Sequence, residues 1–314
     1  MLMAKQIYKL RNWSEYNKNL VERGSINFWF PEETTMCWYH NSATKQKGGQ
    51  LIYSDLAIIT CLIIRSRYDL TLRETQGFVQ SILGMNNIGI KCPDYTALSR
   101  RAQKLDIEIP RLKGVGPIDV VVDSTGFKIY GEGEWKVRQH GYSKRRTWTK
   151  LHVAINPKTH EIVSGVVTSS KVTDDKALPE ILEHIARPIN TVATDGAYDK
   201  KDCYIAINAK NATPIIPPRK DAVVSNDPDL IIRDFAVEYI RRLGNDEDAR
   251  KKWKQNSGYH MRSIAETGMF RLKKIFSNQL RSRKPKTQEV ELKARIAILN
   301  RMTFNGMPDS YRVQ

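Results

Sequence analysis

Two aspartates lie in sequence contexts that favour catalysis. Asp123 follows the short apolar run 118–122, and Asp195 follows the apolar run 191–194. Both runs are typical of buried strands, and catalytic groups of open α/β sheets gather at the carboxyl ends of strands, where loops diverge and leave a crevice. A single strand-end Asp is weak support because Asp is also a common turn former. Two of them in one sheet favour a metal or catalytic site.

Glu266 is the only acidic residue between positions 248 and 289, a region rich in Lys and Arg. On a helix, Tyr259, Arg262, Glu266 and Lys273 fall within an arc of about 60°, opposite an apolar face. The simpler interpretation is an i,i+4 ion pair between Arg262 and Glu266, worth only tenths of a kcal/mol. That pair does not explain why other acids are missing, or why Tyr and Lys share the register.

Three carboxylates brought together repel one another unless cations lie between them. Hard oxygen donors with open positions suit Mg²⁺ or Mn²⁺. Two such ions about 4 Å apart hold the attacking and leaving oxygens of an in-line phosphoryl displacement. Arg262 and Lys273 would then bind phosphates, and Tyr259 would stack on a base or sugar.

These residues resemble the signature of insertion-sequence transposases of the DDE type, whose catalytic domain has an RNase H-like fold. Tyr259, Arg262, Glu266 and Lys273 match the family pattern Y-x2-R-x3-E-x6-K, while DSTG at 123–126 and DGAYD at 195–199 resemble its first and second Asp motifs. The resemblance extends over nearly the whole chain. It implies a catalytic and metal-binding triad of Asp123, Asp195 and Glu266, with two Mg²⁺ (or Mn²⁺) ions per site and no small-molecule cofactor.

The resemblance also implies a function. We expect a transposase that binds the terminal inverted repeats of its element, cleaves the ends by two-metal phosphodiester hydrolysis and transfers the 3′-OH ends into target DNA. We expect a homodimer on double-stranded DNA, in the nucleoid of the bacterial cytoplasm and without membrane attachment. Two alternatives remain: a metal-dependent nuclease that cuts without joining, and a non-catalytic DNA-binding repressor of transposition, against which the complete triad argues.

Periodicity predicts an α/β fold, and with the resemblance an RNase H-like mixed sheet flanked by helices and preceded by a helical N-terminal DNA-binding region. The Pro- and Gly-containing segment 107–117 separates domains 1–110 and 111–314. Three successive strands (118–122, 149–155 and 161–168) come before two more (191–194 and 213–216), which alternate with helices. The segment 217–257 is expected as a largely irregular insertion around one amphipathic stretch, 230–243, before a long helix over 259–280 and a final one over 287–302.

The N-terminal region is predicted to contain three helices. Ser54 caps the first, and Thr71 with Glu74 forms a capping box for the second. The third begins at Asp94 or Thr96 and carries Arg100, Arg101 and Lys104, which we predict to contact DNA. The arrangement resembles a helix-turn-helix, but its ten-residue connection is longer than the usual 3–4. Three packed helices with no DNA role is the alternative.

Charge supports a nucleic-acid partner. The formal net charge is +17 with a pI near 9.7, and residues 250–286 hold twelve Lys/Arg and one acid. A solvated basic face is the alternative. The loop 136–150 mixes basic and aromatic residues, so it is either a DNA-gripping hairpin or an inert loop. Its predicted DNA contacts are Lys136, Arg138, Arg145, Arg146 and Lys150.

Composition also excludes several classes. No apolar run approaches the ~18 residues of a membrane span, and the N-terminus lacks the apolar core of a signal peptide. The four cysteines form no CxxC pair, which argues against a zinc site or a disulfide framework and fits a reducing compartment.

Overall fold

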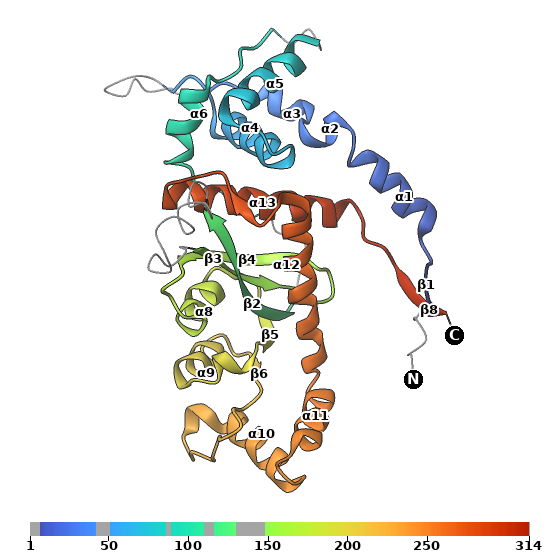
Figure 1. Ribbon diagram of the computed structural model, residues 1–314, viewed down its shortest axis with the longest axis vertical. Coiled ribbons are helices and arrows are strands. Elements are labelled where there is room, and N and C mark those ends of the chain that lie inside the picture. Colours follow the sequence, from blue (N-terminus) through green and yellow to red (C-terminus); the bar gives the residue numbers. More distant parts are fainter. Residues whose placement is uncertain (1–6, 42–50, 86–88, 110–115, 130–147, 314) are drawn as a thin grey trace, which may run out of the picture. The chain divides into compact units, whose positions relative to one another are not determined.

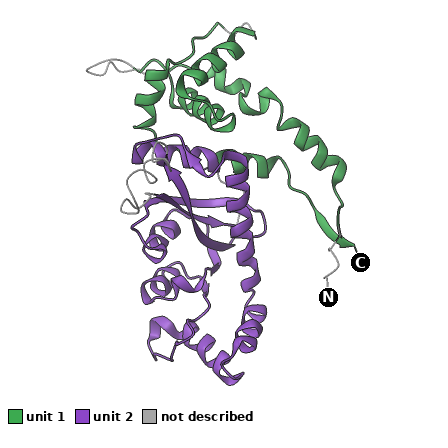
Figure 2. Ribbon diagram, viewed as in Figure 1, with its two compact units in different colours: residues 1–107, 297–314 green, residues 108–296 purple. Residues whose placement is uncertain are grey.

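The computed structural model describes residues 7–41, 51–85, 89–109, 116–129 and 148–313. Two compact units divide the chain (Figure 2): unit 1 comprises residues 1–107 and 297–314, and unit 2 comprises residues 108–296. The predicted boundary at 110/111 falls on residues outside the described part. The predicted second domain ran to residue 314, whereas the fold groups residues 297–314 with the N-terminal unit.

Strand pairing between the two ends of the chain explains this grouping. In unit 1, β1 (Ile7–Leu10) pairs antiparallel with β8 (Ser310–Val313), so that the terminal segments lie side by side (Figure 1). The side chain of Asn12 donates to the carbonyl of Met307 at 3.0 Å, and Arg23 donates to the carbonyl of Met302 at 2.8 Å. A pairing between residues almost 300 positions apart leaves no local signal in the sequence.

The other named elements of unit 1 in the described residues are helices. Helices α4, α5 and α6 pack against one another as the predicted three helices. Ser54 accepts a hydrogen bond from the amide of Ala57, and Thr71 and Glu74 exchange the two bonds of a capping box, which confirms both predicted caps. The helices of this unit are α1 (Trp13–Glu22), α2 (Ile26–Trp29), α3 (Glu32–Met36), α4 (Asp55–Arg67), α5 (Leu72–Met85) and α6 (Tyr95–Ala102).

Unit 2 is built on a mixed sheet in the order β4-β3-β2-β5-β6, with short β7 paired to the far end of β2. Strands β2, β3 and β4 are antiparallel neighbours, and β5 and β6 run parallel to β2. This mixed sheet flanked by helices confirms the predicted α/β fold class. The strands are β2 (Ile118–Ile129), β3 (Trp148–Ile155), β4 (Ile162–Ser169), β5 (Ile189–Ala193), β6 (Thr213–Ile215) and β7 (Gln279–Leu280).

Buried aliphatic residues of the central strands form the core of unit 2. Val120, Val122 and Val192 are fully buried and pack with Leu178 and Ile181 of α8. The helices and short 3₁₀ turns of the unit are α8 (Asp174–Glu183), η1 (Gly196–Tyr198), α9 (Lys201–Asn208), η2 (Pro228–Leu230), α10 (Ile231–Arg242), α11 (Glu247–Asn256), η3 (Tyr259–Arg262), α12 (Ser263–Phe276) and α13 (Pro285–Asn305), which crosses the unit boundary.

The segment 217–257 is more ordered than predicted. It contains α10, near the expected amphipathic stretch, and also α11, which the sequence analysis took as irregular. Helix α11 buries only Ala249, so it has no apolar stripe from which a helix could be recognised. Arg250 instead fixes it by donating to the carbonyl of Pro218 at 2.9 Å.

Candidate active site

The two aspartates lie at matching positions on adjacent parallel strands. The register pairs Val121 of β2 with Ala193 of β5, and each aspartate lies two residues beyond its strand's member of that pair. Asp123 was predicted to lie at the end of its strand, but the strand continues beyond it. Strand β2 continues to Ile129 because its second half still pairs with β3, while β5 has already ended. The two aspartates therefore lie where β5 stops beside β2.

Helix α12 brings the third carboxylate, Glu266, close to Asp123. It packs on β2 and β3, and η3 before it contacts β2 and β5. Gly268 allows a close approach, because a Cβ there would lie 2.4 Å from Cδ1 of Ile155. Leu272 is fully buried on the same face. The predicted uninterrupted helix from Tyr259 is instead a 3₁₀ turn followed by α12, and Glu266 lies in the first turn of α12.

Arg262 joins two of the three carboxylates. One guanidinium nitrogen, Nη1, lies 2.7 Å from Oε1 of Glu266 and 3.5 Å from Oδ2 of Asp123. The Arg262 side chain is 19% exposed, whereas Glu266 is 64% exposed. The ion pair of the simpler interpretation is therefore present, but it is part of a larger cluster that extends to the sheet.

The three carboxylates act on one another electrostatically. Burial raises the pKa of Asp123, and the negative charges of Asp195 and Glu266 raise it further, against the opposing effects of the Ser124 amide and Arg262. Asp195 has its own structural bond, because its Oδ1 accepts from the amide of Ala197 at 2.9 Å. The three predicted triad residues thus share one local field.

The remaining signature residues border the same site. Burial raises the pKa of Tyr259, and Asp195 and Asp123 contribute to that rise. The Tyr259 ring lies 6.2 Å from the ring of Trp253. Lys273 lies with its ammonium 5.6 Å from the ring centre of Phe127, and burial lowers its pKa.

Two residues of the DGAYD segment have roles that the sequence analysis missed. The hydroxyl of Tyr198 is buried without a hydrogen-bond partner among the described residues, and after burial itself Asp174, Asp123 and Asp195 all help to raise its pKa. The carboxylate of Asp199 accepts hydrogen bonds from Tyr204 at 3.0 Å and from Arg233 at 2.8 Å. Arg233 lies 34 positions away, so no local pattern could reveal this bond.

The predicted DNA-contacting residues fall into three groups. Arg100 and Lys104 are exposed at the end of α6. Arg101 and Lys150 are engaged internally: Arg101 binds Asp55 and the carbonyl of Tyr53, and Lys150 binds Asp174 at 2.8 Å. The others lie outside the described residues: Lys136, Arg138, Arg145 and Arg146.

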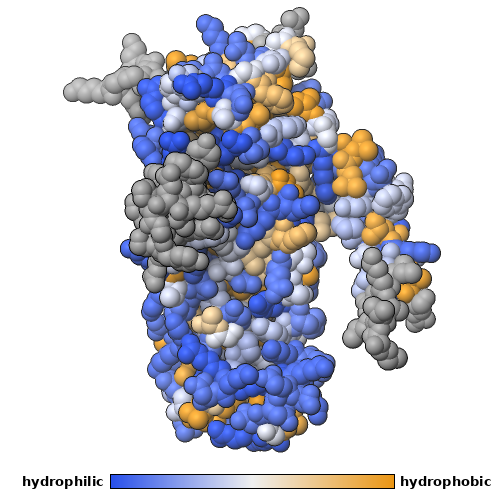
Figure 3. All heavy atoms as spheres, in the orientation of Figure 1, coloured by the Kyte–Doolittle hydropathy of each residue, from blue (hydrophilic) through white to orange (hydrophobic). Residues whose placement is uncertain are grey.

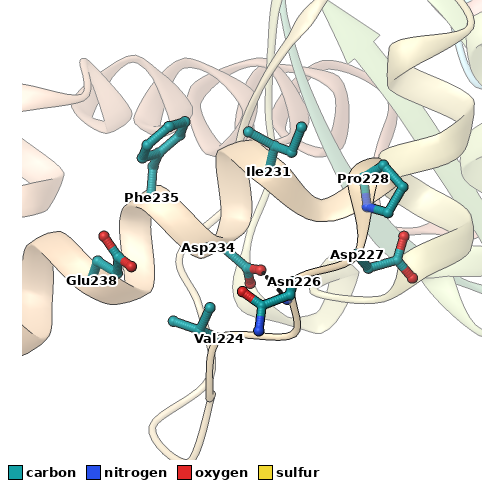
Figure 4. A pocket seen from close by; sticks show the side chains of 8 residues that line it. All are labelled: Val224, Asn226, Asp227, Pro228, Ile231, Asp234, Phe235 and Glu238. Atoms are coloured by element: carbon teal, nitrogen blue, oxygen red, sulfur yellow. Dashed lines mark hydrogen bonds between the residues drawn. The ribbon is translucent and has the colours of Figure 1, made fainter.

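A hollow of about 380 Å³ lies against α10, away from the carboxylates (Figure 4). Its central acid, Asp234, already accepts hydrogen bonds from the amides of Ser225 and Asn226 at 3.0 and 2.9 Å. Ile231 and Phe235 of this helix are exposed apolar side chains. Figure 3 shows small orange patches among mostly blue side chains at the end of unit 2 that carries α10 and α11. The other two carboxylates of the hollow, Asp227 and Glu238, pair with Lys201 and Arg242.

The described residues contain neither a compact group of metal-ligating side chains nor a membrane-spanning helix. No group of three or more His, Cys, Asp or Glu side chains is close enough there to bind a metal ion. No helix in the described part of the chain has the length and apolar character needed to cross a membrane.

Known proteins resemble this chain in sequence. Two family models, both described as "Transposase DDE domain", match residues 21–132 and 115–301. One solved structure, titled "CryoEM structure of simian T-cell lymphotropic virus intasome in complex with PP2A regulatory subunit B56 gamma", is 16% identical over 58% of this chain and 66% of that chain. Its TM-score of 0.23 is too low to add to the fold assignment. The second model spans more than half of the chain and covers all three carboxylates, so the protein belongs to the DDE transposase family.

Proposed function

We propose that the protein is a transposase that cleaves the ends of its own element and joins the 3′-OH ends to target DNA. The observation that carries this proposal is the matched placement of Asp123 and Asp195 beyond a paired position of β2 and β5, with Glu266 of α12 in the same field. Acids placed in this way on rigid elements serve phosphoryl transfer better than fold stability, because clustered like charges are destabilising.

The donor set fits divalent cations. Asp123, Asp195 and Glu266 supply hard oxygen donors, and a positive group, Arg262, already lies among them. The buried hydroxyl of Tyr198, which has no hydrogen-bond partner among the described residues and whose pKa is raised by burial and then by Asp174, Asp123 and Asp195, is a further polar atom in the field of these carboxylates. We therefore assign these three carboxylates as the residues that would hold two Mg²⁺ or Mn²⁺ ions. Such ions activate the attacking oxygen and stabilise the leaving oxygen.

Residues around the carboxylates would bind the DNA backbone. Arg262 offers a planar fork and Lys273 a point charge for phosphates, while Tyr259 offers a ring for stacking on a base or sugar. Each of these three groups lies on η3 or α12, so one rigid segment would orient the scissile phosphate. The exposed Lys251, Lys252 and Lys254 of α11 extend this basic surface.

Recognition of the element ends is assigned to the N-terminal region. The exposed Arg100 and Lys104 of α6 are retained as DNA contacts, whereas Arg101 is engaged with Asp55. Transposition requires the two ends of the element to be held together. A homodimer on double-stranded DNA in the bacterial nucleoid is therefore part of the proposal.

Neutral replacement of each triad residue tests the proposal. Asp123→Asn, Asp195→Asn and Glu266→Gln should each abolish cleavage and joining of a duplex that carries the repeats flanking the gene. Binding of that duplex should survive, because affinity comes mainly from Lys and Arg contacts to phosphate. The matched control is Asp202→Asn, an exposed acid of α9 that pairs with Lys176 and should leave all three readouts unchanged.

The outcomes separate the alternatives. Cleavage without strand transfer by the unaltered protein would identify a nuclease of the same fold, and binding without metal-dependent nicking would identify a repressor. Near-normal cleavage by any one triad variant in Mg²⁺ would show that its residue is misassigned.

A further inference from the structure

Arg262 occupies a position that local helix energetics do not favour. It is the N-cap residue of α12, where the partial positive charge of the helix dipole favours an anion over a cation. Its side chain makes no cap hydrogen bond, and its Nε atom is buried without a hydrogen-bond partner among the described residues. Both features have an energetic cost, so another interaction must hold the guanidinium there.

The carboxylate cluster supplies that interaction. Nη1 of Arg262 lies within 3.5 Å of oxygens of both Asp123 and Glu266. Burial acts to lower the pKa of Arg262, but Tyr259, Asp123, Glu266 and Asp195 together raise it. The guanidinium is thus the cation that offsets repulsion among the acids.

The same oxygens are the ligands assigned above to the divalent ions. A ligand oxygen of Mg²⁺ lies 2.0–2.1 Å from the ion, which leaves no room for a guanidinium nitrogen between the same two carboxylates.

We propose that Arg262 is a resident counter-cation of the carboxylate cluster, and that it competes with divalent ions for Asp123 and Glu266. Once displaced, its guanidinium is free to bind a DNA phosphate. Ion binding and DNA binding are therefore linked through this one side chain, so that each strengthens the other. This inference rests on the proposed function, since it takes the triad as the metal site.

The first test measures Mn²⁺ affinity of the full-length, DNA-free protein by the electron paramagnetic resonance signal of free Mn²⁺. Arg262→Gln should bind Mn²⁺ at least about tenfold more tightly than the unaltered protein, a difference of about 1.4 kcal/mol. Arg262→Lys keeps the positive charge but loses the planar guanidinium. Its Mn²⁺ affinity should lie between those of Arg262→Gln and the unaltered protein. Lys274→Gln is the matched control: it removes one positive charge from the same helix, but at an exposed position that makes no ion pair with the cluster.

The second test measures linkage by fluorescence anisotropy of a labelled duplex, with Ca²⁺ or with a chelator. Ca²⁺ should tighten DNA binding by the unaltered protein and by Lys274→Gln, and the increment should be lost in Arg262→Gln. Equal Mn²⁺ affinities for Arg262→Gln and Lys274→Gln, or an undiminished Ca²⁺ increment in Arg262→Gln, would overturn the inference. Failure of the proposed function looks different: Asp123→Asn would then bind Mn²⁺ as tightly as the unaltered protein.

Discussion

Arg101 and Arg262 both bind carboxylates, and they differ in what surrounds the ion pair. Arg101 of α6 binds Asp55, the first residue of α4, and also donates to the carbonyl of Tyr53 at 2.8 Å. That bond ties one helix to its neighbour. Arg262 lies in a cluster of three acids, leaves its Nε unpartnered and stands at an unfavourable helix end. The first arginine completes a fold contact, whereas the second offsets a concentration of negative charge.

The difference shows why charge alone is a poor guide to a binding site. Arg100, Arg101 and Lys104 were equivalent in the sequence, but in the structure Arg101 is mostly buried and the other two are exposed. Lys150 is likewise paired with Asp174. The signature of residue type and spacing predicted one helix for four residues; Glu266 and Lys273 do lie on α12, whereas Tyr259 and Arg262 lie in the preceding 3₁₀ turn η3.

The largest expected effect concerns the packing that positions the cluster. Leu272→Ala should lower the free energy of unfolding by about 2–5 kcal/mol, because it removes a fully buried side chain from the face of α12 that packs on the sheet. Thermal and denaturant unfolding measure the change. A loss below about 0.5 kcal/mol, typical of surface positions, would mean that α12 is not held by this face.

The Arg101 contact should have a moderate effect. Arg101→Ala should cost about 1 kcal/mol of stability through its lost hydrogen bonds, whereas Arg100→Ala should leave stability within about 0.5 kcal/mol. DNA affinity should respond in the opposite order, since only Arg100 is exposed. Anisotropy on both variants, normalised to their folded fractions, checks this. A larger affinity loss in Arg101→Ala at full folding would contradict the division.

Arg262 should matter less for stability than for activity. Arg262→Ala should lower the unfolding free energy of the metal-free protein by about 1 kcal/mol, because Asp123 and Glu266 lose their counter-cation and relief of the buried Nε offsets only part of that loss. Cleavage or joining should fall at least about tenfold, on the order of 1.4 kcal/mol in the barrier. A large melting loss with a proportionate activity loss would make Arg262 a structural residue like Arg101.

The smallest expected effect is on the pH dependence of stability and concerns His160, in the hairpin between β3 and β4. Burial lowers the pKa of His160, and the charge of Arg271 on α12 lowers it further. The folded state therefore prefers neutral His160, so stability should fall as pH drops below the unfolded value of about 6.5. His160→Asn should reduce that slope with little strain, because Asn tolerates the left-handed φ of 59° at this position. An unchanged slope between about pH 7 and 5 would mean that His160 is not a group whose pKa folding lowers.

Local signals predicted much of this fold. The caps at Ser54 and Thr71 were recognisable because their partners lie three residues away. Long-range pairings were not recognisable: β1 with β8, and Asp199 with Arg233, join segments with no shared local pattern. The end of β2 was misplaced because its polar second half is stabilised by strand partners and not by apolar alternation.

The residues of the candidate site could be proposed from the sequence, but the contact between Arg262 and Asp123 could not. Asp123, Asp195 and Glu266 were identified from strand ends and helical spacing, and the structure brings their charges together. The second bond of Arg262, to Asp123, depends on tertiary packing between η3 and β2, which the sequence could not supply.

A change of metal preference tests the central claim, that Asp123 binds the catalytic ion, most directly. A thiolate is a softer ligand than a carboxylate and suits Mn²⁺ better than Mg²⁺. Asp123→Cys should therefore be inactive in cleavage with Mg²⁺ and regain activity with Mn²⁺, while Asp202→Cys should cleave normally with either ion. Near-normal cleavage by Asp123→Cys in Mg²⁺ would contradict the assignment of Asp123 as a metal ligand.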